Sequence, residues 1–204
     1  MTLTTIKNDI KAFGKKKLEY MRGYIAMQED FQDKLQKQLI GKVYAEQELL
    51  KYKKEGENYS QNNAQLLYQQ LEKEKNAELA NHKLKEEPIT ADDAAELSLL
   101  SSIKLTATEM QEYLEKYKNK PLAFRKLEEI MENDTTLAYI EIDMEQFSWQ
   151  QRLEKLVHFL DRKIDYFYDG LLINGDKIDL VQHEMIVEGN LEAIDAELQR
   201  YLEQ

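Results

Sequence analysis

The first eighty or so residues carry apolar side chains at helical spacing. From Leu3 to about Lys85 the chain contains no proline, and its apolar residues recur at intervals of three, four and their sums. This pattern predicts one apolar stripe along a helix. An unbroken helix of that length would extend over about 120 Å, so the stripe must fold back on the chain, pair with another copy or lie on a partner. We predict protein contacts through the stripe residues, which are Ile6, Ile10, Phe13, Met21, Tyr24, Phe31, Leu35 and Leu39.

One glycine in this region indicates a break in the helix. Gly56 follows three lysines, which suit a helix C-terminus, and precedes polar residues that suit a new N-cap. The sequence therefore predicts either a helical hairpin broken at about 55–60, with a second helix over about 59–86, or one continuous helix. The remaining glycines of the region are expected inside helices because strong periodic patterns surround them: Gly14, Gly23 and Gly41.

Pro88 separates this region from a run of short helices. Thr90 and Asp93 have the spacing of a capping box, which predicts a helix over about 91–104. A second pair, Thr106 and Glu109, predicts a helix over 107–118. Pro121 suits the first position of a third helix, which continues to about 132. We therefore predict two domains, an extended helical region over 1–87 and a compact helical domain over 88–204.

The last sixty residues contain the most amphipathic helix of the chain. Residues 135–144 are predicted as a loop or a continued helix, and Ser148 with Gln151 then forms another capping box. The following helix carries apolar residues at helical spacing from Trp149 to Tyr168 and ends at Gly170.

The segment after Gly170 has two interpretations. Asn174-Gly175 suits a type I′ hairpin turn, but we prefer Asp176 as the N-cap of a helix over about 177–187. Gly189 is then expected to end that helix, and Asn190 to cap a final one. The predicted C-terminal helices occupy residues 148–204.

These elements predict an all-α fold, with a long N-terminal helix or coiled-coil-like helical hairpin followed by a compact bundle of short helices. Composition agrees, because 33% of residues are charged and the chain has only 7 glycines and 2 prolines. The chain has no cysteine, which excludes disulfides, thiolate zinc sites and a cysteine nucleophile and fits a reducing cytoplasm. It also lacks a run of about 18 apolar residues and a secretory signal. We therefore expect no membrane partner.

Charge is distributed unevenly along the chain. The net charge is −11, and residues 1–87 carry 16 Lys and Arg against 14 Asp and Glu, whereas residues 145–204 carry 6 against 13. An acidic surface repels phosphate backbones, so we expect no nucleic-acid partner. The basic cluster Lys15–Lys17 is interpreted as a solvated helix face. The opposite charges of the two ends favour contact between copies or docking on a basic surface.

No catalytic, cofactor-binding or metal-binding residue is predicted. His183, Glu184 and Glu188 are interpreted as part of a solvated acidic face, and His158 as a core or edge histidine. The series Asp161, Asp165 and Asp169 is interpreted as a surface salt-bridge face with Arg162 and Lys163. The sequence has no phosphate-binding loop and no nucleophile–base pair. These observations favour a protein that is not an enzyme and needs no cofactor.

One segment resembles a known class of proteins. Residues 105–131 have a capped helix that ends in a Tyr-Lys-Asn turn, followed by a short helix with Arg-x-Leu. This segment, with the long charged helix before it, resembles small head-gene-cluster proteins of tailed phages and prophages of Gram-positive bacteria, a class that includes scaffolding and other capsid-assembly proteins. The residues that carry the resemblance are Leu105, Thr106, Glu109, Met110, Tyr113, Leu114, Tyr117, Lys118, Asn119, Pro121, Leu122, Ala123, Arg125 and Leu127.

The resemblance implies a non-enzymatic structural or assembly protein, scaffolding-like or a minor virion component. It would self-associate as a homo-oligomer, contact capsid or portal proteins, and occur in the host cytoplasm during assembly or in the virion. The alternative is a cytosolic helical adaptor or regulator that binds one protein partner. A metal-dependent enzyme on a helical bundle is a third hypothesis, which rests only on the scattered acidic residues.

Overall fold

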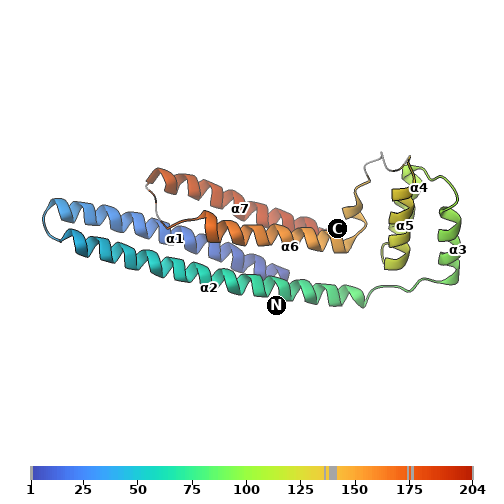
Figure 1. Cartoon of the computed structure of the whole chain (residues 1–204), viewed down its shortest axis with the longest axis horizontal. Coiled ribbons are helices and arrows are strands. Elements are labelled where there is room, and N and C mark those ends of the chain that lie inside the picture. Colours follow the sequence, from blue (N-terminus) through green and yellow to red (C-terminus); the bar gives the residue numbers. More distant parts are fainter. Residues whose placement is uncertain (1, 136, 138–141, 174, 176, 204) are drawn as a thin grey trace. The chain divides into compact units, whose positions relative to one another are not determined.

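The described part of the chain is all-α (Figure 1). The structure is a computed structural model that describes residues 2–135, 137, 142–173, 175 and 177–203. The chain divides into two compact units. One contains Met1–Lys75 and Lys155–Gln204, and the other contains Asn76–Glu154. The all-α fold class predicted from the sequence is confirmed.

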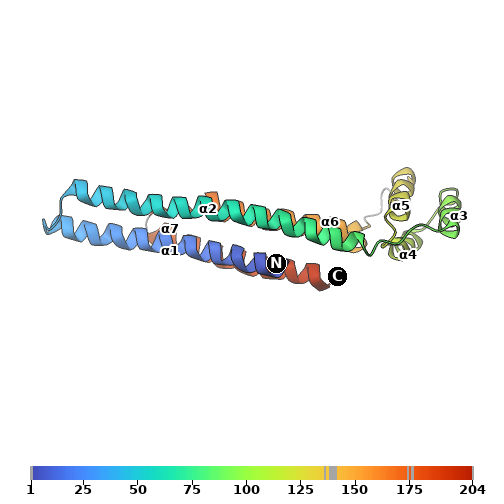
Figure 2. The same ribbon diagram turned by 90° about the horizontal axis from the view of Figure 1, so that it is seen from below.

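The first unit is a bundle of four helical segments. Helices α1 (Leu3–Gln36) and α2 (Lys42–Lys83) form an antiparallel hairpin, and Figure 2 shows them side by side. Helix α6 (Trp149–Asp165) continues into the π-helical turn η3 (Tyr166–Gly170), and α7 (Lys177–Glu203) follows. The unit contains α2 up to Lys75 and α6 from Lys155.

Aromatic pairs join α1 to α2 along the hairpin. The ring centroids of Phe13 and Tyr59 are 6.2 Å apart, and those of Tyr20 and Tyr52 are 5.8 Å apart. Near the turn, Phe31 and Tyr44 are separated by 6.2 Å. Tyrosine suits these positions because its ring packs on the neighbouring helix while its hydroxyl can reach polar groups.

Ion pairs set the antiparallel register of α1 against α7. The carboxylate of Asp195 contacts the ammonium groups of both Lys7 and Lys11. Further along, Arg22 Nε lies 2.7 Å from Glu184 Oε1, and Lys177 Nζ lies 2.7 Å from Glu29 Oε1. Residue numbers rise along α1 as they fall along α7. Exposed pairs contribute only about 0–1 kcal/mol each, so they orient the helices more than they stabilise them.

The predicted break at Gly56 is wrong, because α2 is continuous from Lys42 to Lys83. The hairpin turns instead between Gln36 and Lys42, where Gln38 has a φ of 56° and Gly41, expected inside a helix, lies in the turn. Gly56 is buried inside the helix for a packing reason. A Cβ at this position would lie 2.2 Å from Ile173 Cδ1 and 3.0 Å from Tyr20 Cδ1. The glycine therefore provides the space that the Ile173 side chain fills.

We expect Gly56→Ala to destabilise the bundle, because the added Cβ would force the buried Ile173 side chain and the Tyr20 ring to shift. Overpacking of this kind costs about 1–3 kcal/mol. The matched control is Gly189→Ala, where an added Cβ would meet nothing within 4 Å. That change should raise the free energy of unfolding by up to about 1 kcal/mol, because alanine favours helix more than glycine does. Chemical denaturation measures the free energy of unfolding of both variants. Equal changes in the two variants would contradict the close packing described at Gly56.

The predicted end of a helix at Gly189 is also wrong. Helix α7 continues from Lys177 to Glu203, and its beginning agrees with the helix predicted from about 177. Asn190 was expected as a cap, but it lies inside the helix. Its Nδ2 donates to the Ile186 carbonyl at 2.8 Å, and its Oδ1 accepts a hydrogen bond from Lys163 on α6. Asn174, on which the hairpin-turn alternative depended, and Asp176, the predicted N-cap, both lie outside the described residues.

The second unit contains three short helices with a core of their own. These are α3 (Ala91–Leu100), α4 (Ala107–Tyr117) and α5 (Pro121–Asn133). Both predicted capping boxes are present, and Pro121 occupies the start of α5. Buried residues of all three helices form one cluster, which includes Leu97, Met110, Leu114, Tyr117, Phe124 and Leu127.

Two further predictions concern this unit and the start of α6. Half of the ambiguous stretch 135–144 lies outside the described residues, and its last residue, Met144, begins a short 3-10 helix, η2 (Met144–Gln146). At the start of α6, the Gln151 amide donates to Ser148 Oγ at 3.3 Å, as expected of a capping residue.

The structure divides the chain differently from the predicted 1–87 and 88–204. Residues 155–204 belong with the N-terminal hairpin, and 76–154 form the inserted unit. The physical reason is that the α1 stripe is buried within the chain, against η3 and α7 as well as α2. The stripe could fold back on the chain, pair with another copy or lie on a partner. Over most of its length it is covered by the chain itself.

Candidate protein-interaction surfaces

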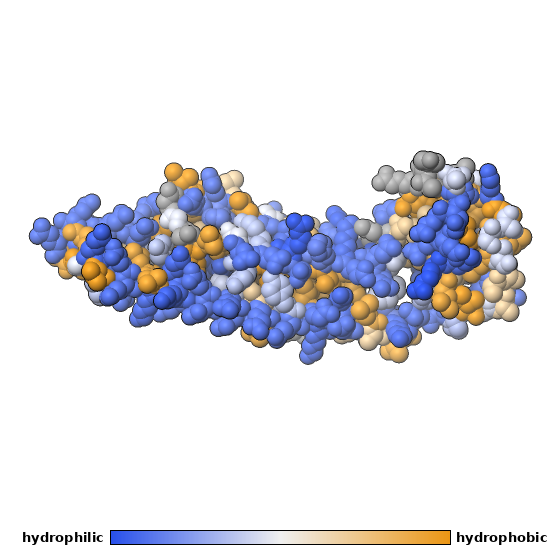
Figure 3. Space-filling model, in the orientation of Figure 1, coloured by the Kyte–Doolittle hydropathy of each residue, from blue (hydrophilic) through white to orange (hydrophobic). Residues whose placement is uncertain are grey.

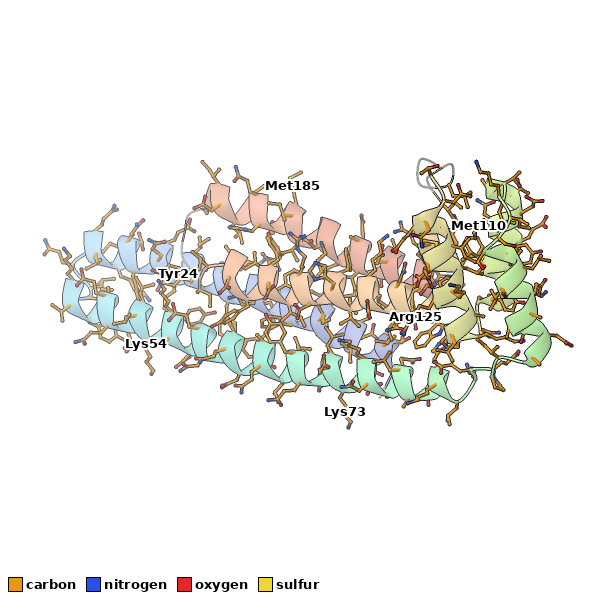
Figure 4. The ribbon with its side chains drawn as sticks, turned by 45° about the vertical axis from the view of Figure 1, so that its right-hand side comes forward. Tyr24, Lys54, Lys73, Met110, Arg125 and Met185 are labelled. Atoms are coloured by element: carbon orange, nitrogen blue, oxygen red, sulfur yellow. The ribbon has the colours of Figure 1, made fainter. Side chains whose placement is uncertain are left out.

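Helix α7 carries an exposed apolar face near its beginning. Ile178, Val181 and Met185 recur at intervals of three and four and are therefore on one side of the helix. Their exposed fractions are 69%, 56% and 71%. Figure 4 labels Met185, which extends from the side of α7 away from α6. We call these three residues the α7 face.

The opposite side of α7 provides its contacts with the bundle. Val187, Ile194 and Leu198 are buried, again at helical spacing. On the outer side, the residues that continue the line of the α7 face are the exposed acids Glu188 and Glu192. The outer side is therefore apolar over its first turns and acidic beyond them.

A second group of exposed apolar residues lies at the end of the hairpin. Leu39 is in the turn, and Val43 and Leu50 follow on α2, seven residues apart. All three are mostly exposed. Figure 3 shows apolar surface near the hairpin end and near the beginning of α7. Most of the remaining surface of the long helices in this view is hydrophilic.

The predicted interaction stripe on α1 is divided between core and surface. Ile6, Ile10, Phe13 and Met21 are buried in the bundle. The rest lie nearer the turn: Tyr24, Phe31 and Leu35 are half-buried, and Leu39 is exposed. Only the part of the stripe near the hairpin turn is therefore accessible to a partner in this fold.

Opposite charges at the two ends of the chain meet within the chain. The acidic residues Glu184 and Asp195 of α7 pair with basic residues of α1. The sequence predicted that these opposite charges would attract separate copies of the chain. In the structure, some of them instead pair within one copy.

The interpretation of Lys15–Lys17 as a solvated face is wrong for its last member. Lys15 and Lys16 are exposed, but the Lys17 side chain is buried and its Nζ donates to the Tyr168 carbonyl at 3.0 Å. The sequence contains a signal for this, because Lys17 is four residues after Phe13 and four before Met21. It therefore occupies a stripe position.

Other candidate residues have structural contacts. His158 is exposed, so it is not a core histidine, whereas His82 stacks on Trp149 with ring centroids 3.9 Å apart. Asp165 accepts a hydrogen bond from the Tyr68 hydroxyl, and burial together with this bond raises the pKa of Tyr68. The three aspartates therefore do not form a simple salt-bridge face.

Two kinds of feature are absent from the described residues. They contain no cluster of three or more His, Cys, Asp or Glu side chains arranged to hold a metal ion. None of the helices they form combines the length and apolar character needed to cross a membrane.

Comparison of the chain with protein-family models, with curated proteins and with solved structures finds no match. The functional argument therefore depends on the surfaces of this chain.

Proposed function

We propose that the protein is a non-enzymatic assembly protein that associates with a second copy of itself through the α7 face. The observation that carries this proposal is the exposure of Ile178, Val181 and Met185 together on one side of a helix. Apolar residues spaced by three and four form the seam of paired helices. A seam identical in two copies can close a twofold-symmetric dimer.

The distribution of charge on α7 favours an antiparallel pair. In a pair centred near Val181, Glu188 of one copy would lie about 20 Å along the axis from Glu188 of the other. That separation exceeds the Debye length of about 8–10 Å, so the repulsion is screened. A parallel pair would place Glu188 and Glu192 beside the same residues of the second copy. The acidic part of the face therefore selects against the parallel arrangement.

The size of the seam sets the expected strength. Three apolar side chains from each copy form a small contact compared with stable interfaces, which bury about 1,200–2,000 Å². We therefore expect association in the micromolar range. Exposed Leu39 and Val43 at the hairpin end offer a separate surface for further copies or for another protein.

The double variant Val181→Lys, Met185→Lys should dissociate the dimer. Each lost apolar contact is worth roughly 1.5–3 kcal/mol, or about a tenfold to hundredfold change in the dissociation constant, and a symmetric dimer loses each contact twice. Sedimentation velocity across micromolar concentrations measures the change.

Leu66→Lys is the matched control, since Leu66 is an exposed leucine on α2, outside the α7 face. It should leave the dissociation constant unchanged. A wild-type chain that remains monomeric would overturn the proposal, as would equal weakening by the control.

The resemblance of residues 105–131 to phage head-gene-cluster proteins favours virion assembly as the setting, with capsid or portal proteins as further partners. The exposed hairpin end supports the alternative, a cytosolic adaptor that binds one other protein. Genes for portal and coat proteins beside this gene would favour the first setting. A monomeric chain that binds a single cellular protein through Leu39 and Val43 would favour the second.

A further inference from the structure

A lysine occupies a core position of the four-helix unit. The Lys17 side chain is only 3% exposed, and its Nζ donates to the Tyr168 carbonyl at 3.0 Å. Tyr168 lies in the π-helical turn η3. In a π-helix the hydrogen-bond pattern shifts by one residue, and such turns occur frequently at functional sites.

Lys17 also lines a pocket of about 320 Å³. Lys53 and Glu57 of α2 and Asp169 of η3 are the other charged residues of its lining. Leu172, which is largely exposed, and buried Ile173 supply an apolar side. Because Glu57, Asp169 and Leu172 are exposed while Lys17 is buried, the amine lies at the inner end of a pocket that reaches the surface.

The surroundings of Lys17 favour its neutral form. Burial lowers the pKa of Lys17 to about 8, although the carboxylates of Asp169 and Glu57 act in the opposite direction. At pH 7 roughly a tenth of such amines are neutral, compared with fewer than about one in a thousand for an ordinary lysine. Only the neutral amine is a nucleophile.

We propose that Lys17 is a carbonyl-binding amine, which forms a Schiff base with a small aldehyde or ketone that enters this pocket. The ammonium first releases a proton to solvent. The Nζ lone pair then forms a bond to the carbonyl carbon, and proton transfer to the oxygen gives a carbinolamine. Loss of that hydroxyl as water leaves the C=N bond, so the step consumes one carbonyl compound and releases one water. No oxidant or reductant is needed.

This proposal does not depend on the proposed dimer. The pocket is formed by α1, α2, η3 and the residues that follow η3, and it contains no residue of the α7 face. Failure of one proposal therefore leaves the other unaffected.

Reductive labelling of the full-length chain tests the proposal. Propionaldehyde at limiting concentration, with cyanoborohydride near pH 7, converts each Schiff base into a stable propylamine, and peptide fragmentation assigns the sites. Lys16 is the internal control, because it is exposed and its pairing with Glu19 raises its pKa. We expect Lys17 to be labelled at least about tenfold faster than Lys16. This ratio of rates is smaller than the ratio of the neutral fractions of the two amines, because the pocket restricts access of the aldehyde to Lys17. Equal or slower labelling of Lys17 would overturn the proposal.

Two further measurements separate the pocket from a local sequence effect. In concentrated guanidinium chloride the preference for Lys17 should disappear, because both amines then have ordinary pKa values. Persistence of the preference would overturn the role of the folded pocket. Asp169→Asn removes a carboxylate that favours the ammonium form, so labelling of Lys17 should become severalfold faster while that of Lys16 stays constant. An unchanged or slower rate at Lys17 would contradict the proposed site.

Discussion

In a fragment of residues 88–204, helices α6 and α7 are expected to be unfolded. In the full chain the apolar sides of these helices pack within the same unit as α1 and α2. The fragment would expose Leu156, Leu160, Ile164, Phe167 and Ile194, which are all buried in the full chain. Each side chain that becomes exposed loses roughly 1.5–3 kcal/mol, so the combined loss of about 7.5–15 kcal/mol is comparable to the 5–15 kcal/mol that stabilises a typical domain.

Hydrogen exchange of the fragment measures this outcome residue by residue. Amides of α7 should exchange rapidly, whereas those of α4 and α5 should remain protected, because their core lies within residues 76–154. A fragment of residues 76–154 is the control and should melt cooperatively. Slow exchange throughout α7 in the 88–204 fragment would contradict the division of the chain into these two units.

The adjacent residues Leu66 and Leu67 provide the second large expected effect. Both are leucines of α2, but Leu67 is 5% exposed and Leu66 is 54% exposed. Leu67→Ala should reduce the free energy of unfolding by about 2–5 kcal/mol, since it removes a buried side chain and leaves a cavity. Leu66→Ala should change it by less than about 0.5 kcal/mol.

Urea denaturation of the two variants gives this comparison directly. Leu66 and Leu67 are the same type of residue at adjacent positions and differ mainly in burial. The difference between the two variants therefore shows which side of α2 is buried. Similar losses for both variants would mean that α2 is rotated or is buried on more than one side, and the hairpin contacts described above would then be wrong.

Local signals predicted the short helices well. The capping boxes at Thr90 and Thr106 and the proline at position 121 each act within one helical turn, so the chain near them is sufficient to define a helix start. The amphipathic helix from Trp149 was predicted for a related reason, since its pattern is repeated over several turns.

Features that depend on distant residues were not predicted. Gly56 and Gly189 are both inside helices, although glycine commonly marks a helix end. At Gly56 the cause is Ile173, more than a hundred residues away, and no local pattern reveals it. The assignment of residues 155–204 to the N-terminal hairpin has the same origin, because it depends on contacts between α1 and α7.

The candidate surface was only partly accessible to sequence reasoning. The first half of α7 has apolar residues around much of its circumference, so the sequence alone does not distinguish the buried side, with Val187, from the exposed side, with Val181. The stripe on α1 was recognised, but whether a partner or the chain itself covers it depends on the tertiary fold. Lys17 was assigned with its exposed neighbours by charge, although its spacing placed it among core residues.

Cysteine cross-linking tests the proposed self-association most directly, because the chain contains no cysteine of its own. In the antiparallel dimer Val181 lies close to Val181 of the second copy, while the exposed Ala196 residues would be about 45 Å apart along the axis. Under mild oxidation, Val181→Cys should form a covalent dimer at concentrations where Ala196→Cys stays monomeric. Cross-linking at Ala196→Cys that equals or exceeds that at Val181→Cys, or none at Val181→Cys, would contradict association through the α7 face.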